Sequence, residues 1–497
     1  MRRDMKKSMT FALAAVVSVM ITGVIFAQQA PASDKSVSLS KVERKNKAPV
    51  SKELIKVKLP RPVEARLDNG LTVLIVENHK LPYVSIEMVI DGAGPISEPA
   101  DKPGLASATA AQMTQGTSTR TSLQIAEQIE LFGAALRVGS PFGGNIANIS
   151  ASGLSETMGS WFPIFVDVLL HSSFPADELK NYQQRSLVDL KRQRSSPAFL
   201  ASERFNRAVY GTFPASIVSA TPEFLQSMTP AMLVSWHDER YVPQNSILGI
   251  AGDVNPAQTI EMLKKSLGGW KRNGTEVKLP PNASPVAKKQ VYLVNRPDSV
   301  QTNIMIGNIA IDRRNPDYVA LRVANQVLGD GPASRLFIKL REEKGYTYHA
   351  GSSFHAFQFP GPWNATSEVR TEVTEGSMVE FFNELNRLGN EKVPDSELED
   401  AKRTIVARFA LSLESPAQAL DAALQVKRYG LPADYWDTYP QQVAAVTAND
   451  VVRVAKKYIN PENAQIVVVG DASKIRSIME KYGPVTMYDT EGKQVAN

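Results

Sequence analysis

Histidine is the only side chain in this sequence that readily binds transition metals through nitrogen, and there is no cysteine to bind one through sulfur. The five histidines are His79, His171, His237, His349 and His355. Zinc peptidases place two histidines on one helix face by spacing them about one turn apart. No two of these histidines lie three or four residues apart. The sequence therefore lacks a helical zinc pair, and the absence of cysteine also excludes thiolate zinc sites and cysteine nucleophiles.

A glycine-rich segment, residues 139–145 (GSPFGGN), is the second feature with chemical potential. It lacks the GxxxxGK[ST] spacing of a phosphate-binding loop, so it predicts a turn between two strands. His349 and His355 flank another predicted strand, where an isolated histidine is more often structural than a ligand. These features leave carboxylates, hydroxyls and isolated histidines for chemistry carried by this chain.

The elements that position these side chains follow from the hydrophobic pattern. Four runs rich in β-branched residues predict strands over residues 71–77, 83–90, 291–295 and 303–309. Apolar residues at helical spacing predict one buried helix face in each half, formed by Met158, Trp161, Phe162, Phe165, Val168 and Leu169, and by Met378, Phe381, Phe382 and Leu385. Strands interleaved with long helices, without regular βαβ alternation, predict an α+β layer architecture.

The two halves of the sequence repeat each other at a nearly constant offset. Two landmark dipeptides, Ser196-Pro197 and Tyr210-Gly211, recur 219 residues later as Ser415-Pro416 and Tyr429-Gly430. The Gly-Asp pairs that begin at residues 252 and 470 are 218 apart. We therefore predict a tandem duplication, with a first domain over residues 61–270, a polar, proline-rich linker over residues 271–288 and a second domain over residues 289–490.

The N-terminus predicts a secretory signal peptide over residues 1–27. Arg2, Arg3, Lys6 and Lys7 precede an apolar stretch over residues 9–26, and small residues suited to signal peptidase follow. That stretch approaches the roughly 20 residues that span a bilayer, so an uncleaved membrane anchor is the alternative. Residues 28–60 are rich in Lys, Ser and Pro and predict a flexible lead-in. We expect a periplasmic protein without membrane contact beyond the signal peptide.

The net charge gives no reason to expect nucleic-acid binding. The formal charge of the whole chain is +5. The predicted signal peptide contributes four bases and Asp4, a net +3, so its removal leaves 5 − 3 = +2. A charge this small does not predict a phosphate-binding surface. The absence of cysteine also suits an oxidising compartment.

Short motifs recur along the chain past residue 60 and form a recognisable set. They are residues 67–73 (LDNGLTV), residues 91–94 (DGAG) with Glu98, residues 104–106 (GLA), and Gly116-Thr117. This set resembles the insulinase/pitrilysin family of metallopeptidases, the inverzincins, over nearly all of the chain past residue 60. The resemblance implies a metallohydrolase-like fold in which two homologous α/β-layer domains make half of a clamshell.

The family binds zinc through an H-x-x-E-H motif on a helix, where the two His hold the metal and the Glu activates its water. Counting from the flanking motifs, the resemblance places the first His at Ser107, the Glu at Ala110 and the second His at Ala111. The family's third ligand, a Glu one long helix later, falls near Val188 and Asp189, and Asp189 alone cannot make a zinc site. Residues 104–117 therefore predict an Ala-rich packed helix, and no zinc is expected in this chain.

A second family feature is retained in the C-terminal half. The family carries an Arg and a Tyr seven residues apart that approach the zinc site from across the cavity and hold the substrate backbone. Arg341 and Tyr348 have this spacing, and Tyr346 is the local rival for the Tyr role. The resemblance implies that both donate to a peptide carbonyl or to the developing oxyanion. Without it, the segment indicates a charged helix end followed by an ordinary strand tyrosine.

Loss of the zinc motif together with the retained Arg and Tyr resembles one subunit of this family's two-chain enzymes, and the resemblance implies a non-catalytic, substrate-holding subunit of a periplasmic heterodimeric zinc metalloendopeptidase, inactive alone. The resemblance is to the zinc-less chain of bacterial two-chain peptidases and to mitochondrial processing peptidase, so the partner is a homologous subunit that supplies zinc and the general base. The substrates are peptides. The alternative is an inactive scaffold or peptide-binding module, similar to the core subunits of respiratory complexes. A self-sufficient enzyme with unusual ligands is disfavoured because the sequence offers no ligand cluster.

Overall fold

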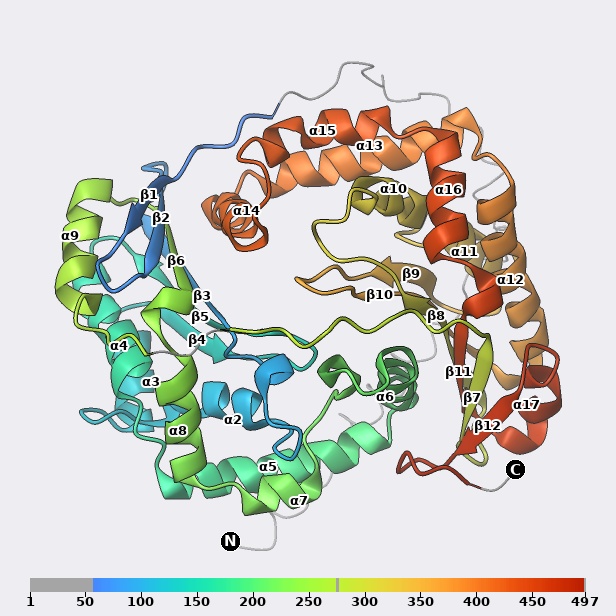
Figure 1. Cartoon of the computed structure of the whole chain (residues 1–497), viewed down its shortest axis with the longest axis horizontal. Coiled ribbons are helices and arrows are strands. Elements are labelled where there is room, and N and C mark those ends of the chain that lie inside the picture. The colour runs from blue at the N-terminus through green and yellow to red at the C-terminus, as the bar shows by residue number, and fades with distance from the viewer. Residues whose placement is uncertain (1–56, 274–276, 496–497) are drawn as a thin grey trace, which may run out of the picture. The chain divides into compact units, whose positions relative to one another are not determined.

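The computed structural model describes residues 57–273 and 277–495 (Figure 1). The predicted signal peptide, and the predicted lead-in as far as residue 56, lie outside the described residues. Among the residues that are described, no helix has the length and apolar character needed to cross a membrane. All of the described residues belong to one compact unit.

The first half is built on a six-stranded mixed sheet. Its strands are β1 (Val63–Arg66), β2 (Thr72–Glu77), β3 (Tyr83–Asp91), β4 (Ala135–Gly139), β5 (Ile146–Leu154) and β6 (Ser246–Gly252). Their order across the sheet is β1-β2-β6-β3-β5-β4, and only the β2–β6 pair is parallel. The strands predicted over residues 71–77 and 83–90 are confirmed to within one residue. The predicted turn over residues 139–145 joins β4 to β5.

The second half contains a sheet of the same size. Its strands are β7 (Gln290–Asn295), β8 (Gln301–Ile309), β9 (Ala350–Phe354), β10 (Pro362–Arg370), β11 (Gln465–Gly470) and β12 (Val485–Tyr488). Their order is β12-β7-β11-β8-β10-β9. The strand predicted over residues 303–309 begins two residues earlier than expected. His349 and His355 flank β9, as predicted.

Strand order confirms the duplication. The five strands β2-β6-β3-β5-β4 correspond in order to β7-β11-β8-β10-β9. β3 begins at residue 83 and β8 at residue 301, an offset of 218. The sixth strand breaks the repeat, because the N-terminal β1 pairs antiparallel with β2 whereas the C-terminal β12 pairs parallel with β7. The two halves therefore share a five-stranded core and recruit their last strand from opposite ends of the described chain.

Helices account for most of the remaining chain. In the first half they are α2 (Leu105–Gln112), α3 (Ser122–Leu131), α4 (Met158–His171), α5 (Ala176–Arg194), α6 (Pro197–Tyr210), α7 (Pro222–Ser227), α8 (Pro230–Arg240) and α9 (Pro256–Leu267). Short 3₁₀ turns lie at η2 (Pro95–Ser97), η3 (Met113–Gln115), η4 (Pro214–Ser216) and η5 (Pro243–Asn245). Where the predicted linker is described, at residues 271–273 and 277–288, it contains no helix or strand. The domain boundaries themselves stay a prediction.

The second half repeats this helical arrangement. Its helices are α10 (Tyr318–Leu328), α11 (Arg335–Phe337), α12 (Thr374–Asn390), α13 (Asp395–Ser412), α14 (Pro416–Tyr429), α15 (Tyr435–Ala445), α16 (Ala448–Tyr458) and α17 (Ala472–Met479). A π-helix, η6 (Ile338–Glu343), continues α11, and 3₁₀ turns lie at η7 (Thr371–Val373) and η8 (Pro461–Asn463). Long helices between mixed strands give the α+β class that the pattern predicted.

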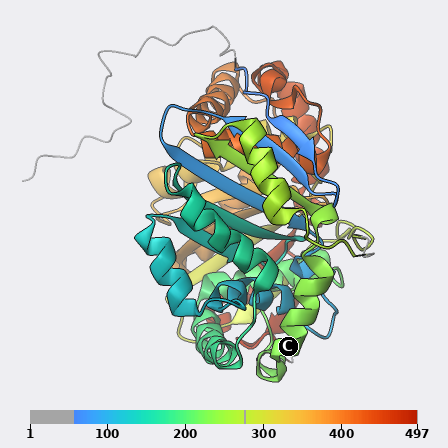
Figure 2. The same ribbon diagram turned by 90° about the vertical axis from the view of Figure 1, so that its left-hand side faces the viewer.

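Each sheet buries one face against helices of its own half, and Figure 2 shows helices crossing in front of the first sheet. Alternate residues of β3, such as Ile86 and Met88, pack with Trp161 and Phe165 of α4 in one core. In the second half, α12 contributes Phe381 to the equivalent core. The two apolar helix faces predicted from sequence are confirmed, although Met158 and Phe382 are only partly buried.

The opposite face of each sheet is covered by a helix from the other half. Leu420 and Leu424 of α14 pack against Leu74 of β2 and against neighbouring residues of the first sheet. Phe205 of α6 packs in a cluster with Val467 of the second sheet. Figure 1 shows α14 and α6 between the two sheets. The halves therefore exchange one helix each, and neither sheet is covered by its own half alone.

The repeated dipeptides of the sequence mark the ends of these exchanged helices. The Ser196 hydroxyl accepts a hydrogen bond from the backbone N–H of Phe199, and a proline fits the first helical turn, where no N–H is needed. α14 also begins with a proline after a serine, although the Ser415 side chain makes no capping hydrogen bond. Gly430 ends α14 in the left-handed conformation, with φ of 61°. The landmark pairs thus delimit two equivalent helices.

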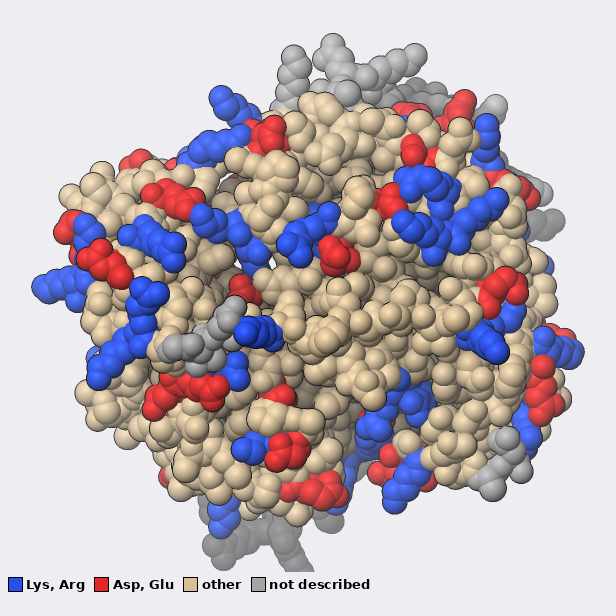
Figure 3. Space-filling model, in the orientation of Figure 1, with Lys and Arg blue, Asp and Glu red and all other residues tan. Residues whose placement is uncertain are grey.

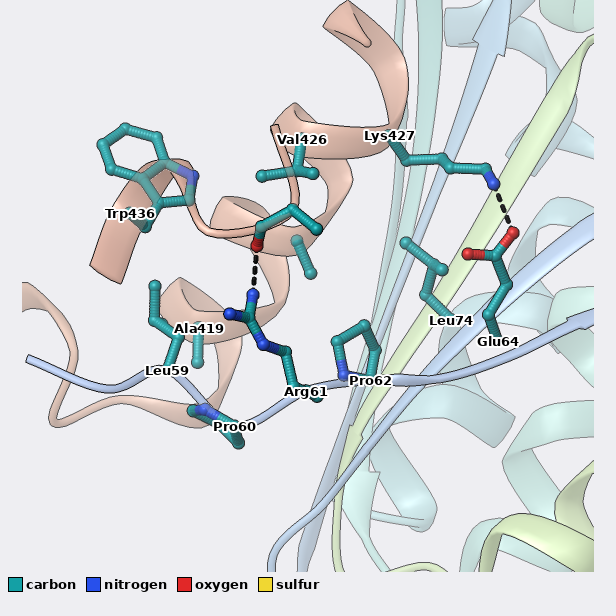
Figure 4. A pocket seen from close by; sticks show the side chains of 12 residues that line it. Leu59, Pro60, Arg61, Pro62, Glu64, Leu74, Ala419, Val426, Lys427 and Trp436 are labelled. Atoms are coloured by element: carbon teal, nitrogen blue, oxygen red, sulfur yellow. Dashed lines mark hydrogen bonds and ion pairs between the residues drawn. The ribbon is translucent and has the colours of Figure 1, made fainter. Parts of the chain in front are cut away.

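Residues 59–62, near the start of the described chain, form a strap that joins the halves. The Leu59 N–H and the Arg61 guanidinium donate to the Asp437 carboxylate of α15 at 3.1 Å and 2.5 Å. Figure 4 shows this segment beside a cavity of about 220 Å³, with Lys427 of α14 paired to Glu64 of β1. The Arg61 side chain is half exposed, so its ion pair adds at most about 1 kcal/mol. The strap therefore fixes the position of these residues but adds little to the free energy of unfolding.

Charged side chains of both signs are interspersed over the face seen in Figure 3. Nucleic-acid-binding domains instead gather Lys and Arg into one patch or stripe. This view adds no support for nucleic-acid binding, in line with the small net charge.

Candidate functional site

The three positions that the resemblance assigns to the zinc motif lie on α2. Ser107 is half-buried, and its hydroxyl donates to the Ser140 carbonyl at 2.7 Å. Ala110 is fully buried, whereas Ala111 is exposed on the same helix. The α-helix ends at Gln112 and continues as a 3₁₀ turn, so the packed helix is shorter than the predicted residues 104–117. The assignment of these residues as former motif positions stays a prediction.

Glu98 holds the start of α2. Its two carboxylate oxygens accept from the backbone N–H groups of Gly104 at 2.9 Å and Ala106 at 2.5 Å. Gly104 has φ of 99°, a left-handed conformation that favours glycine. Burial raises the pKa of Glu98 to about 7, although the two backbone hydrogen bonds oppose this rise. The N-terminus of α2 is thus capped by a carboxyl group that titrates near neutral pH.

The structure does not bring Asp189 to α2 as a ligand. Its carboxylate is exposed on α5 and pairs with Arg192 at 3.0 Å. Val188 is also exposed. Tyr182 lies earlier on α5. Burial is the largest cause that raises the pKa of Tyr182, and the charge of Glu98 raises it further. Within the described ranges, no group of three or more His, Cys, Asp or Glu side chains could hold a metal ion.

Arg341 lies in the π-helix that continues α11. A π-helix turn displaces the following chain relative to an α-helix and is frequent at functional sites. The Arg341 guanidinium stacks on the Phe337 ring at 4.8 Å and lies 3.6 Å from the Glu342 carboxylate. Its side chain is about half exposed, at 46%. The guanidinium therefore remains able to donate to an incoming acceptor.

Tyr348 is the most exposed of the large apolar and aromatic side chains in the described chain, at 90%. The backbone around it is nevertheless fixed. The Thr347 hydroxyl lies within hydrogen-bond distance of the Glu368 carbonyl of β10, and Arg370 donates to the Gly345 carbonyl at 3.2 Å. Tyr346 instead packs against the second core. The geometry therefore favours Tyr348 over Tyr346 for contact with a ligand.

Sequence reasoning missed the group that anchors this segment. Arg335, at the start of α11, is buried and makes two hydrogen bonds to Glu397 of α13, at 2.7 Å and 2.8 Å. Its remaining terminal nitrogen faces Glu384 of α12 at 4.0 Å. Two parallel N–H···O bonds fix both position and orientation. Arg335 thus ties the base of the segment to two helices, and its only sequence signal was a charged residue in an apolar helix start.

Comparison with known proteins identifies relatives of this chain. Residues 227–405 match the family model described as Peptidase M16 inactive domain, a match that crosses the predicted linker. The Bacillus subtilis protein named uncharacterized zinc protease YmxG is 24% identical over 354 residues, covering 70% of this chain and 83% of the relative. The Helicobacter pylori protein named non-peptidase homolog YmxG is 21% identical, covering 81% of this chain and 92% of the relative.

Solved structures show similarity to the same family. A peptidase M16 inactive domain from Pseudomonas fluorescens superposes with a TM-score of 0.77 at 26% identity, covering 83% of this chain and 98% of that one. A protease from Helicobacter pylori superposes with a TM-score of 0.76 at 20% identity, covering 83% and 100%. The second match shows the fold alone. The chain is thus similar to the M16 peptidases, the insulinase-like family, and its residues 227–405 match the model of the Peptidase M16 inactive domain.

Proposed function

We propose that this chain is the non-catalytic, substrate-holding subunit of a periplasmic heterodimeric zinc metallopeptidase that acts on peptides. A homologous partner subunit supplies the zinc ion and the general base, and this chain supplies Arg341 and Tyr348. The observation that carries the proposal is an asymmetry. Helix α2 has a serine and two alanines at the motif positions, while the segment carrying Arg341 and Tyr348 is both fixed and exposed.

The chemistry of the pair suits peptide hydrolysis. A guanidinium and a phenol can each donate hydrogen bonds to a carbonyl oxygen. Placed beside a metal-bound water, such donors stabilise the negative charge that develops on the scissile carbonyl oxygen. A fixed backbone limits the reorganisation needed when the donor engages. In this proposal, Arg341 and Tyr348 are the two donors.

The sheet edges provide a second support for peptide holding. β4 is the outermost strand of the first sheet, and β9 is the outermost strand of the second. An extended peptide can add to such an edge through main-chain hydrogen bonds, largely independent of its sequence. Side chains of β4 are exposed or half-buried, whereas Ala350, Gly351 and Ser352 of β9 are buried, so β4 is the more accessible edge.

The sharpest test replaces Tyr348 by Phe, which removes one hydroxyl and keeps the ring. In a complex reconstituted with the zinc-motif-bearing homologue, turnover of an unstructured peptide should fall by roughly a hundred- to a thousand-fold, the usual loss of one oxyanion donor. Arg341→Ala should lower turnover in the same way. Tyr346→Phe is the matched control, because it removes a hydroxyl from the neighbouring tyrosine that packs on the core.

The second candidate is an inactive scaffold or peptide-binding module of the same fold. The name of the Helicobacter pylori relative, a non-peptidase homolog, favours it. The scaffold requires no donor at position 348. Full turnover by the Tyr348→Phe and Arg341→Ala complexes, with association unchanged in sedimentation, would therefore reject the substrate-holding role and leave the scaffold.

A further inference from the structure

A pocket of about 320 Å³ lies where the two halves meet. Its walls come from β3 and β5 of the first sheet, from the start of α10 and the chain before it, from the residue Ala356 after β9, and from α14. The polar lining residues are Glu87, Asn148, Arg313, Tyr318, Asp421, Gln425, Arg428 and Tyr429. Its volume is at the lower end of the range for small-molecule sites, about 300–1,000 Å³. Neither Arg341 nor Tyr348 lines it, so the inference does not rest on the proposed function.

One wall carries a buried cation with an unpartnered donor. Arg313 is only 4% exposed. One terminal nitrogen donates to the Tyr435 hydroxyl at 3.1 Å, and the guanidinium lies 3.9 Å from the centre of the Tyr318 ring. The other terminal nitrogen, Nη2, has no hydrogen-bond partner among the described residues. Buried polar groups are nearly always satisfied, so an orphan donor beside a cavity indicates a missing acceptor.

The opposite charge comes from two carboxylates, one on each half. Glu87 of β3 and Asp421 of α14 both line the pocket, and Gln425 donates to the Asp421 carboxylate at 2.7 Å. Burial first, and then the charge of Asp421, raise the pKa of Glu87 to about 7. Two carboxylates that repel each other in this way favour a cation between them.

We propose that this pocket binds a small zwitterion of the amino-acid or short-peptide class, with its carboxylate on Arg313 and its ammonium group between Glu87 and Asp421. A simple anion is opposed by the two carboxylates, and a simple cation by Arg313 and by Arg428. A free amino terminus and a free carboxyl terminus in one small molecule satisfy both walls. Because the walls belong to both halves, the ligand bridges the exchanged helix α14 and the first sheet.

The test uses calorimetric titration of the full mature chain with the dipeptide alanyl-alanine. We expect one binding site per chain. N-acetyl-alanyl-alanine and alanyl-alanine amide, each lacking one terminal charge, should bind at least about tenfold more weakly, because each loses a hydrogen bond to a charged group. Alanine and trialanine, titrated alongside, define the preferred length within the class.

Three variants assign the contacts. Asp421→Asn and Glu87→Gln should each weaken binding of the free dipeptide about tenfold or more and leave binding of the acetylated dipeptide nearly unchanged. Arg313→Met should weaken binding of the free dipeptide and leave binding of the dipeptide amide nearly unchanged. Asp189→Asn, an exposed carboxylate on α5 outside the pocket, is the matched control and should change nothing.

Arg313 is buried, so its variant can fail to fold, but Asp421 is exposed and keeps the test open. No binding of alanine, alanyl-alanine or trialanine at millimolar concentration would overturn the proposal. So would equal affinity for the free and blocked dipeptides, or unchanged affinity in both carboxylate variants. None of these outcomes bears on turnover by the Tyr348→Phe complex.

Discussion

Ser107, Ala110 and Ala111 decide the metal chemistry available on α2. A catalytic zinc site needs three nitrogen, oxygen or sulfur ligands that converge on one point. The Ser107 hydroxyl is the only polar group at these positions, and it is already bonded to the Ser140 carbonyl. We therefore predict that the purified mature chain retains less than one zinc per molecule and does not hydrolyse an unstructured peptide. Elemental analysis after dialysis, with the zinc-motif homologue as positive control, measures this, and one tightly held zinc per chain would contradict it.

Glu98 gives a second prediction at the residue scale, on pH and stability. A glutamate in an unfolded chain titrates near pH 4.3, whereas burial raises the pKa of folded Glu98 to about 7. Between these values the folded state holds a proton that the unfolded chain has released. The contribution of Glu98 is therefore largest at low pH and is lost as pH rises through about 7. From pH 5 to pH 8, the free energy of unfolding of the natural protein should fall by up to about 3 kcal/mol more than that of the Glu98→Gln variant.

Urea unfolding of both proteins at several pH values measures this difference. The variant keeps a hydrogen-bond acceptor but cannot titrate, so other groups contribute equally to both curves. Glu178→Gln on α5 is the matched control, because it removes a carboxylate that accepts from the Ser122 hydroxyl and lies outside the start of α2. A constant difference between Glu98→Gln and the natural protein across pH 5 to 8 would show that Glu98 is ionised throughout.

Sequence alone predicted the candidate residues of the site but not the groups that support them. Arg341 and Tyr348 came from a spacing within a resemblance, and Ser107 from counting between motifs. Arg335 and Glu397 are 62 residues apart, and nothing local in either stretch signals their pairing. Arg313 and Asp421 likewise meet only through the fold. Contacts of this kind depend on which helices pack together in the fold. The local periodicity of the sequence carries no information about that packing.

At the element scale, the exchanged helices explain why the landmark dipeptides repeat. Helix α14 packs Leu420 directly over Gly249 of β6, where an added Cβ would lie 2.6 Å from its side chain. We predict that Leu420→Ala destabilises the chain by about 2–5 kcal/mol, the usual cost of a buried leucine truncation. Because this helix covers the first sheet, hydrogen exchange should accelerate in β2 and β6, which lie more than 160 residues earlier.

The location of the effect is the decisive readout. Leu388→Ala truncates an equally buried leucine of α12, which packs in the core of its own half. That variant should accelerate exchange in the second sheet and leave β2 and β6 at the rates set by global unfolding. If Leu420→Ala also raised exchange only in the second half, α14 would not cover the first sheet in solution.

The sequence predicted these elements better than their partners. Strand runs and helix stripes follow from alternation and from 3.6-residue periodicity, and the observed bounds agree to within a few residues. The amphipathic face of α14 shows that the helix packs on something apolar. Nothing in that face says which of two similar sheets receives it, because both sheets present aliphatic residues. The exchange is therefore a property of the folded duplication, not of either repeat.

At the scale of the whole molecule, the duplication and the exchange have opposite consequences. Two similar sheets with a linker between them predict two domains that fold separately. The exchanged helices, the Leu59–Pro62 strap and the junction pocket instead make each half depend on the other. Contacts accordingly group residues Leu54–Asn497 into one unit. The ancestral repeat unit and the present folding unit therefore differ in size.

This dependence yields the last prediction, on the separated halves. Without α14, the first sheet exposes Leu74, Val76 and Val89, each less than 10% exposed in the intact chain. Uncovering three such side chains costs about 5–9 kcal/mol. A typical domain has a total stability of only about 5–15 kcal/mol, so the loss is comparable to the whole. We expect residues 57–273, produced alone, to lack a cooperative urea transition and to bind a hydrophobic dye.

Co-expression with residues 277–495 should restore both the cooperative transition and the low dye binding, because α14 then returns to the first sheet. The Leu420→Ala change in the second fragment should weaken this restoration, whereas Leu388→Ala should weaken it only through the stability of its own half. A cooperative transition of the isolated first half, at the urea midpoint of the intact chain, would show that each repeat is an independent domain and that the exchanged helices contribute association rather than folding.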